Sequence, residues 1–184
     1  MTCVVYANAQ DEKLLPVDEQ GKFIYYEVVT LKGTTQDSLK RRAINYFKNQ
    51  NKDVQFKSAQ GDTAFIATGK MIITKTLLVM SHPSGEILYR FQVEVKEGKY
   101  RFWLSDFSFI PYQRDRYGNF VASTTIGIPL EREPGKLNAG QWKEYQLQTA
   151  TYAKGFAVKF KQVMASSNPR VESVPEKKVI SKNW

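Results

Sequence analysis

Apolar and polar residues alternate with a period of two through the middle of the chain. Between residues 87 and 96, every second position from Ile87 is apolar or aromatic, and the positions between them are mostly polar. This alternation predicts an antiparallel strand with one face on a core and the other toward water. Glu97-Gly98 then predicts a two-residue hairpin connection into a returning strand at residues 99–109.

Other segments show strand composition without so regular an alternation. Residues 23–30 (FIYYEVVT) are rich in β-branched and aromatic residues, and residues 53–59 and 63–74 predict two more strands. A strand-like LLVM follows at residues 77–80. SHPSG at residues 81–85 predicts a turn, because serine, proline and glycine cluster there.

The period changes to that of a helix in two places. Residues 34–52 predict a helix capped by Thr34 or Thr35, with one apolar stripe. A longer helix is predicted from Asn138, a plausible cap, to about residue 163, with aromatic residues recurring at steps of three and four. Between the hairpin and this helix, residues 111–137 predict a long connection with a short edge strand at residues 121–128.

These elements predict an α+β fold in the order β-α-β-β-β-β-α. Two amphipathic helices need an apolar surface, so we expect a curved antiparallel sheet of about five strands with both helices on one face. The other face is then left open to solvent or to a partner. We expect a leader or signal-peptide remnant at residues 1–14, a single domain at residues 15–165 and a flexible tail at residues 166–184.

The motifs GKFIYYEVVTLKGTTQDSLKRRAINYFK and EGKYRFWLSDFSF, with the turn-flanked strands between them, resemble domain-of-unknown-function family 4468. The resemblance covers roughly residues 15–110. It implies a fold like one half of the TATA-binding protein (TBP-like), and it implies an exported, envelope-associated protein of a Gram-negative gut anaerobe. It implies no activity, cofactor or catalytic residue.

The stretch Ala7-Asn8-Ala9 has the small-x-small pattern that ends a signal peptide, but no basic segment precedes it. Together with the resemblance, it predicts an exported, periplasmic or envelope-associated protein whose signal is truncated here. No apolar run approaches the length of a transmembrane helix. The only cysteine is Cys3, so neither an intramolecular disulfide nor a cysteine-based metal site is expected.

The formal net charge is +9, which raises the question of nucleic-acid binding. The excess lies on the two predicted helices and the tail, and solvated helix faces explain such charge more often than a phosphate-binding stripe does. No catalytic, metal or cofactor constellation stands out. His82 is expected to be a solvated turn residue, and Asp106 is expected to pair with Arg101 or with a backbone group.

The open face of the sheet is the one feature that suggests a site. If Tyr100 and its alternate neighbours face the helices, the candidate contact residues point the other way: Arg90, Gln92, Arg101, Trp103 and Phe107. Tryptophan and arginine dominate binding hot spots. The competing interpretation is that the long connection or a second copy of the chain, in a homodimer, covers this face, since monomers seldom leave such aromatics bare.

The first hypothesis is a non-enzymatic binding or structural module of the cell envelope that contacts an unknown protein, peptide or glycan. The second is nucleic-acid binding through the sheet face, which Glu94 and the single copy of the repeat unit disfavour. The third is a carrier of a small apolar ligand between the last helix and the sheet, lined by Tyr152, Phe156 and Phe160. Close packing of such rings is the more frequent outcome.

Overall fold

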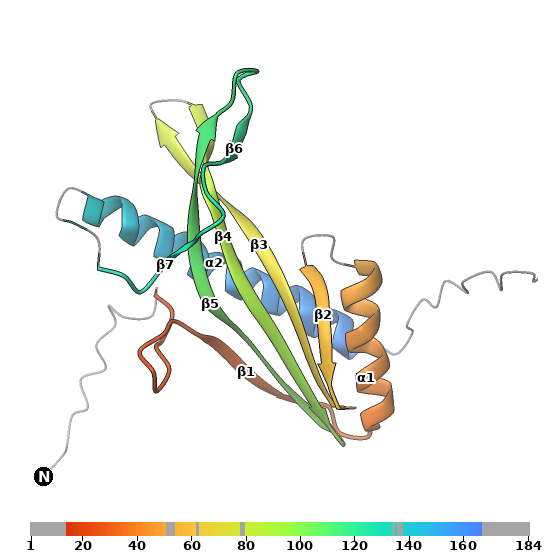
Figure 1. Ribbon diagram of the computed structural model, residues 1–184. Coiled ribbons are helices and arrows are strands. Elements are labelled where there is room, and N and C mark those ends of the chain that lie inside the picture. Colours follow the sequence, from red (N-terminus) through yellow and green to blue (C-terminus); the bar gives the residue numbers. More distant parts are fainter. Residues whose placement is uncertain are drawn as a thin grey trace, which may run out of the picture.

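In a computed structural model, an open antiparallel sheet packs on one face against two helices, of which the longer one crosses the strands (Figure 1). The structure describes residues 14–50, 54–61, 63–77, 80–133, 135 and 138–166. Most of the predicted leader and most of the predicted tail lie outside these residues. The elements are β1 (Tyr25–Thr30), α1 (Gln36–Asn45), a π-helical turn (Tyr46–Gln50), β2 (Val54–Gln60), β3 (Ala64–Leu77), β4 (Met80–Lys96), β5 (Lys99–Arg114), β6 (Phe120–Ala122), β7 (Ile128–Pro129) and α2 (Ala139–Ala165).

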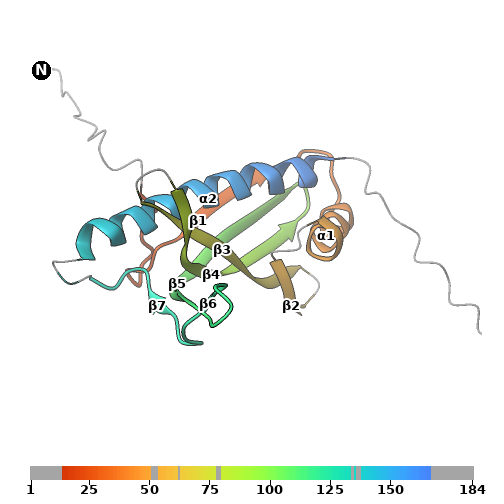
Figure 2. The same ribbon diagram turned by 90° about the horizontal axis from the view of Figure 1, so that it is seen from above.

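The main strand order is β1-β5-β4-β3-β2, with β6 and β7 paired to the far part of β5. Every pairing is antiparallel, as hairpin-connected strands require. α2 runs across one side of the sheet, and α1 lies near the C-terminal end of α2 (Figure 2). The predicted α+β fold, with two helices on one face of an antiparallel sheet, is confirmed.

Aromatic rings fill the space between the helices and the sheet. Phe91 of β4 lies 4.7 Å from Phe156 and 5.1 Å from Phe160, measured between ring centroids. Tyr46, from the turn after α1, lies 5.0 Å from Phe160 and joins the two helices. Tyr152 packs on Phe156 and donates or accepts a hydrogen bond with the Tyr89 hydroxyl. The rings predicted to line a ligand cavity therefore pack against one another and the sheet.

The start of α1 is held by a side chain and by the β4–β5 hairpin. Thr35 is the N-cap, and its Oγ1 accepts from the Ser38 backbone N–H at 3.3 Å. The Gln36 N–H donates to Glu97 Oε2 at 2.8 Å, which places a carboxylate at the positive end of the helix. Asn138 precedes α2 as predicted, but its side chain makes no capping hydrogen bond.

The turn predicted at residues 81–85 is wrong, because β4 already begins at Met80. Ile73 pairs with Gly85 and Thr74 with Pro83, so the register shifts by one residue between these pairs. Proline and glycine are tolerated in a strand at such irregularities. His82 consequently lies in β4, where its ring stacks on Phe120 with centroids 5.8 Å apart.

The prediction that Phe107 lies on the open face is also wrong. Arg90 pairs with Ser105 and Leu88 with Ser108, so β5 contains one extra residue at this point. Asp106 carries that irregularity with a φ of 55°, a left-handed value uncommon outside glycine. Because a one-residue shift exchanges the two faces of a strand, Phe107 turns toward the core and is 1% exposed.

The long connection is more ordered than its composition predicts. β5 continues to Arg114, and the predicted edge strand at residues 121–128 is divided between β6 and β7. β7 pairs with Ser108 and Phe109 of β5, beyond the part of β5 that pairs with β1. The described part of the connection thus extends the sheet along its β1 edge and does not cover the face formed by β1, β5 and β4.

Candidate functional site

The sheet face opposite the helices is built from two rows of cross-strand neighbours. Tyr26, Trp103 and Gln92 form one row on β1, β5 and β4. Val28, Arg101 and Glu94 form the next row. Strand alternation places these side chains away from α2, because the residues between them, such as Phe102 and Val93, are fully buried in the core.

The structure brings four predicted contact residues to this face: Arg90, Gln92, Arg101 and Trp103. Arg90 lies one step further along β4, between the buried Tyr89 and Phe91. We call the surface around Trp103 the open face, made of Tyr26, Val28, Arg90, Gln92, Glu94, Arg101 and Trp103. Its β1 residues were not predicted, since the register of β1 against β5 cannot be read from local patterns.

Tyr26 and Val28 are the most exposed apolar side chains of the open face. Their exposed fractions are 47% and 57%, although both stand beside large neighbours on β5. The Tyr26 and Trp103 rings lie 6.3 Å apart and are inclined by 40°. The sequence signal that could have placed Tyr26 and Val28 on the same face is their spacing of two positions within FIYYEVVT.

Arg101 is held in place over Trp103. Its guanidinium carbon lies 5.6 Å from the Trp103 ring centroid, within cation–π range. The guanidinium also donates to Glu94 Oε2, at 2.7 Å from Nε and 2.6 Å from Nη2. The bond to Glu94, and then one to Tyr26, raises the pKa of Arg101 above its ordinary value. The ring and its charged neighbour are therefore pre-positioned.

A second charged cluster lies where β5 is irregular. Asp106 Oδ1 accepts from Lys22 Nζ at 2.9 Å, and Asp106 Oδ2 lies 3.5 Å from Arg90 Nε. The expected pairing of Asp106 with Arg101 is therefore wrong, because Arg101 pairs with Glu94. The Asp106 carboxylate raises the pKa of Lys22 by its hydrogen bond and its charge. This cluster borders a pocket of about 430 Å³ whose lining includes Lys57 and Lys70.

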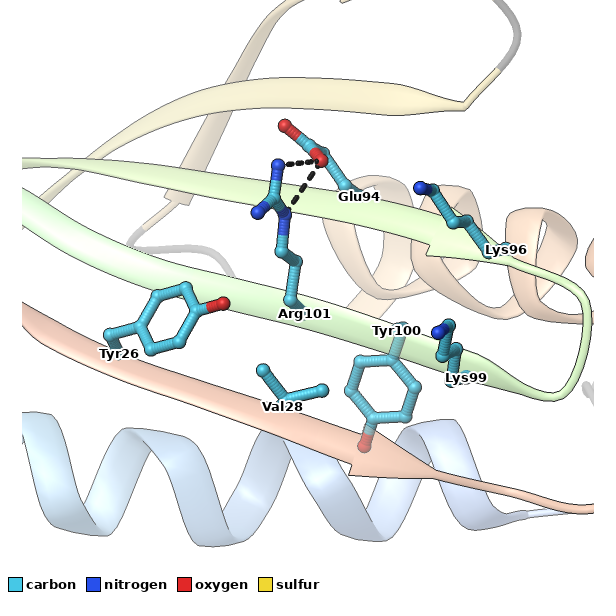
Figure 3. A pocket seen from close by; sticks show the side chains of 7 residues that line it. All are labelled: Tyr26, Val28, Glu94, Lys96, Lys99, Tyr100 and Arg101. Atoms are coloured by element: carbon cyan, nitrogen blue, oxygen red, sulfur yellow. Dashed lines mark hydrogen bonds and ion pairs between the residues drawn. The ribbon is translucent and has the colours of Figure 1, made fainter.

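A smaller pocket of about 240 Å³ lies at the hairpin end of the open face (Figure 3). It is lined by Tyr26, Val28, Glu94, Lys96, Lys99, Tyr100 and Arg101. Figure 3 shows the β1 side chains on one side of it and the two lysines at the hairpin end. We call this the hairpin pocket.

Tyr100 lies at the boundary between this pocket and the core. It is 2% exposed, and its hydroxyl has no hydrogen-bond partner among the described residues. Burial, and secondarily the negative charge of Glu27, raise its pKa above the ordinary value of 10.0. Glu27 itself is held by Lys161 of α2 at 2.7 Å, which ties β1 to that helix.

Tyr100→Phe is expected to raise the free energy of unfolding by about 1 kcal/mol, since it removes a buried hydroxyl that lacks a partner. The raised pKa adds a pH dependence. The parent keeps its full free energy of unfolding below pH 10. Above pH 10 the phenol ionises first in the unfolded chain, so the free energy of unfolding of the parent falls as the pH rises. Urea unfolding at pH 7 and pH 10.5 measures both effects. A variant less stable than the parent at both pH values would contradict this.

His82, the single histidine of the chain, lies in β4 outside the open face. His82 stacks on Phe120, and the Arg114 guanidinium carbon lies 5.0 Å from the centroid of the same Phe120 ring. Where the structure describes the chain, no three His, Cys, Asp or Glu side chains gather as metal ligands would. None of the described helices is long and apolar enough to span a membrane.

The comparisons with known proteins agree on the fold. Residues 25–110 match a family model described as a domain of unknown function (DUF4468) with TBP-like fold. A crystal structure of a DUF4468 family protein from Bacteroides ovatus is similar, with a TM-score of 0.59 and 12% identity over 85% of this chain and 92% of that one. A TBP-like protein from Parabacteroides distasonis has a TM-score of 0.63 and 12% identity, over 83% and 98% of the two chains. No curated protein matches this chain. At this identity, the similarity carries the fold and not the function.

Proposed function

Residues 25–110 of this chain form a domain of the DUF4468 family with a TBP-like fold, and from this premise we propose a non-enzymatic binding module that contacts its partner through the open face. The partner is a protein, a peptide or a glycan. The observation that carries the proposal is Trp103 held between Arg101 and Tyr26 on a sheet face that no described helix covers. Tryptophan, tyrosine and arginine are the residues that dominate binding hot spots.

The pre-positioning of these groups supports binding over a purely structural role. Val28 and Tyr26 expose apolar surface although the core beneath them is filled. Ion pairs fix the arginines, so little side-chain entropy is lost when a partner docks. Glu94 on the open face and Asp106 beside it are engaged in those pairs, which supports a binding rather than a catalytic role.

The same proposal places the module in the cell envelope. Its support is the Ala7-Asn8-Ala9 pattern, which is typical of the end of an export signal. Envelope and cytoplasmic extracts of the producing cell therefore serve as the two sources of partner in the experiment below.

The double variant Tyr26→Ala/Trp103→Ala is expected to weaken partner binding at least about tenfold, because truncating paired hot-spot aromatics removes their buried contact. The parent protein is used to capture a partner from each extract, the partner is purified, and affinities are measured by calorimetry. Val158→Ala is the matched control, since Val158 is 51% exposed on the outer side of α2 and should leave binding unchanged.

Three results would count against the proposal. One is equal affinity of the partner for the double variant and for the parent. Another is capture only from the cytoplasmic extract, which would contradict the envelope assignment. The third is tight binding of duplex DNA with a steep dependence on salt, which would favour the nucleic-acid alternative.

A further inference from the structure

Two lysines face each other at the end of the open face without a compensating acid. Lys96 and Lys99 are direct cross-strand partners on either side of the Glu97-Gly98 turn. Both side chains are exposed, and neither ammonium group has an ion-pair or hydrogen-bond partner among the described residues. Glu97, the acid nearest in sequence, is directed instead to the N-terminus of α1.

This arrangement is unfavourable for the isolated domain. Like charges directly opposite each other on neighbouring strands repel, whereas an opposite pair at these positions would stabilise the hairpin. Local conflicts of this kind are found where a function requires them. An anion bound between the two ammonium groups would remove the repulsion.

The side chains around the two lysines indicate what kind of molecule would carry this anionic group. The hairpin pocket has an apolar side formed by Tyr26 and Val28 and a positive end formed by Lys96 and Lys99 (Figure 3). The remaining charged pair, Arg101 with Glu94, is neutral as a unit. The pocket therefore suits a ligand that carries an acidic group next to an apolar one.

Two observations favour a peptide as this ligand. β1 ends the strand order β1-β5-β4-β3-β2, so no described strand pairs with its outer edge beside Tyr26 and Val28. Extended peptides bind to such edges through their main chain, with side chains entering neighbouring pockets. In addition, Arg101 lies over the Trp103 ring, which leaves less flat aromatic surface for a sugar to stack on.

We propose that the hairpin pocket binds a carboxylate of an acidic peptide, with Lys96 and Lys99 as the anion-binding groups and Val28 and Tyr26 as the contact for its apolar neighbour. This inference rests on the proposed function, because it names the ligand class for one end of the open face. The carboxylate lies between the two ammonium groups, and the adjacent apolar side chain covers Val28.

The test is a titration of ¹⁵N-labelled protein with the peptide acetyl-Glu-Leu-Glu-amide at low salt, followed by NMR. Saturable shifts are expected in the amides of residues 96–101, and acetyl-Gln-Leu-Gln-amide should produce none that saturate. Lys96→Gln/Lys99→Gln should weaken the acidic peptide about fivefold to tenfold, as the loss of two exposed ion pairs predicts. The thermal stability of this double variant should equal or exceed that of the parent, because the repulsion between the two lysines is gone.

The matched control is Lys143→Gln/Lys159→Gln, which removes the same charge from exposed positions of α2 and should leave the affinity unchanged. Equal shifts from the two peptides, or equal weakening by the two double variants, would overturn the inference. Tighter binding of trigalacturonate than of the acidic peptide would replace the peptide with an acidic glycan. If the pocket fails these tests while Tyr26→Ala/Trp103→Ala still weakens partner binding, the proposed function stands without the pocket.

Discussion

Phe91→Ala is expected to lower the free energy of unfolding by about 4 kcal/mol, the range for a large aromatic removed from a filled core. Phe91 is fully buried at the centre of the sheet. Its ring contacts those of Tyr46, Phe47, Phe102, Phe156 and Phe160, with centroids 4.7 to 6.3 Å away. Because these rings come from β5, the π-helical turn and α2, no single element can move to fill the space. Urea unfolding followed by circular dichroism measures the change.

Phe56→Ala is the matched control for this variant. Phe56 is also a phenylalanine on the sheet, but it is 41% exposed on the edge strand β2, and its one ring contact among the described residues is with Phe47. The same truncation there should lower the free energy of unfolding by about 1 kcal/mol, since the ring is partly in contact with water and less buried apolar surface is removed. Similar losses in the two variants would show that the ring cluster does not hold the helices to the sheet.

The sequence was sufficient to predict the order and type of the elements. Alternation along residues 87–96 and the Glu97-Gly98 turn predicted the central hairpin, and the helical period from Asn138 predicted α2. Patterns of this kind act over a few residues and are repeated along an element, so they survive local exceptions. The placement of both helices on one face followed from their need for an apolar surface.

The errors lie where one strand contains an extra residue opposite its partner. At residues 81–85 the cluster of serine, proline and glycine predicted a turn, but it marks an irregularity inside β4. At Asp106 the alternation of β5 reverses, which moved Phe107 from the predicted face into the core. An extra residue is decided by pairing with a distant strand, so no local pattern reveals it.

The candidate site was predicted only in part, again because pairing between distant strands decides which residues meet. Arg101 and Trp103 lie before the irregularity of β5, where alternation still assigns faces correctly. Their β1 neighbours and the Lys22–Asp106 ion pair depend on long-range pairing and could not be predicted. The pairing of Lys96 with Lys99 follows directly from the hairpin register that Glu97-Gly98 predicts, so it could be predicted from the sequence. The pocket beside the two lysines, which suggests a role for them, could not.

Gly85→Ala is expected to lower the free energy of unfolding by about 3 kcal/mol, at the upper end of the usual range for overpacking. A Cβ at Gly85 would lie far inside van der Waals contact of the Ile110 carbonyl oxygen and of the Phe109 ring. The Ile110 oxygen belongs to the backbone of β5, and Phe109 is 6% exposed and packed 4.5 Å from the Tyr145 ring, so neither can move without displacing the sheet from α2. Thermal and urea unfolding measure the loss.

Gly155→Ala is the matched control, because it adds the same methyl group where nothing lies within 4 Å. Gly155 is in the interior of α2, where alanine is the better helix former by about 1 kcal/mol, so this variant should be more stable than the parent. Opposite signs at the two glycines are the expected result, since packing determines the effect at one and backbone entropy at the other. If Gly85→Ala leaves the free energy of unfolding unchanged, β4 and β5 separate easily beyond Asp106. The irregularity at Asp106 would then act as a hinge between the open face and the outer part of the sheet rather than as a rigid change of register.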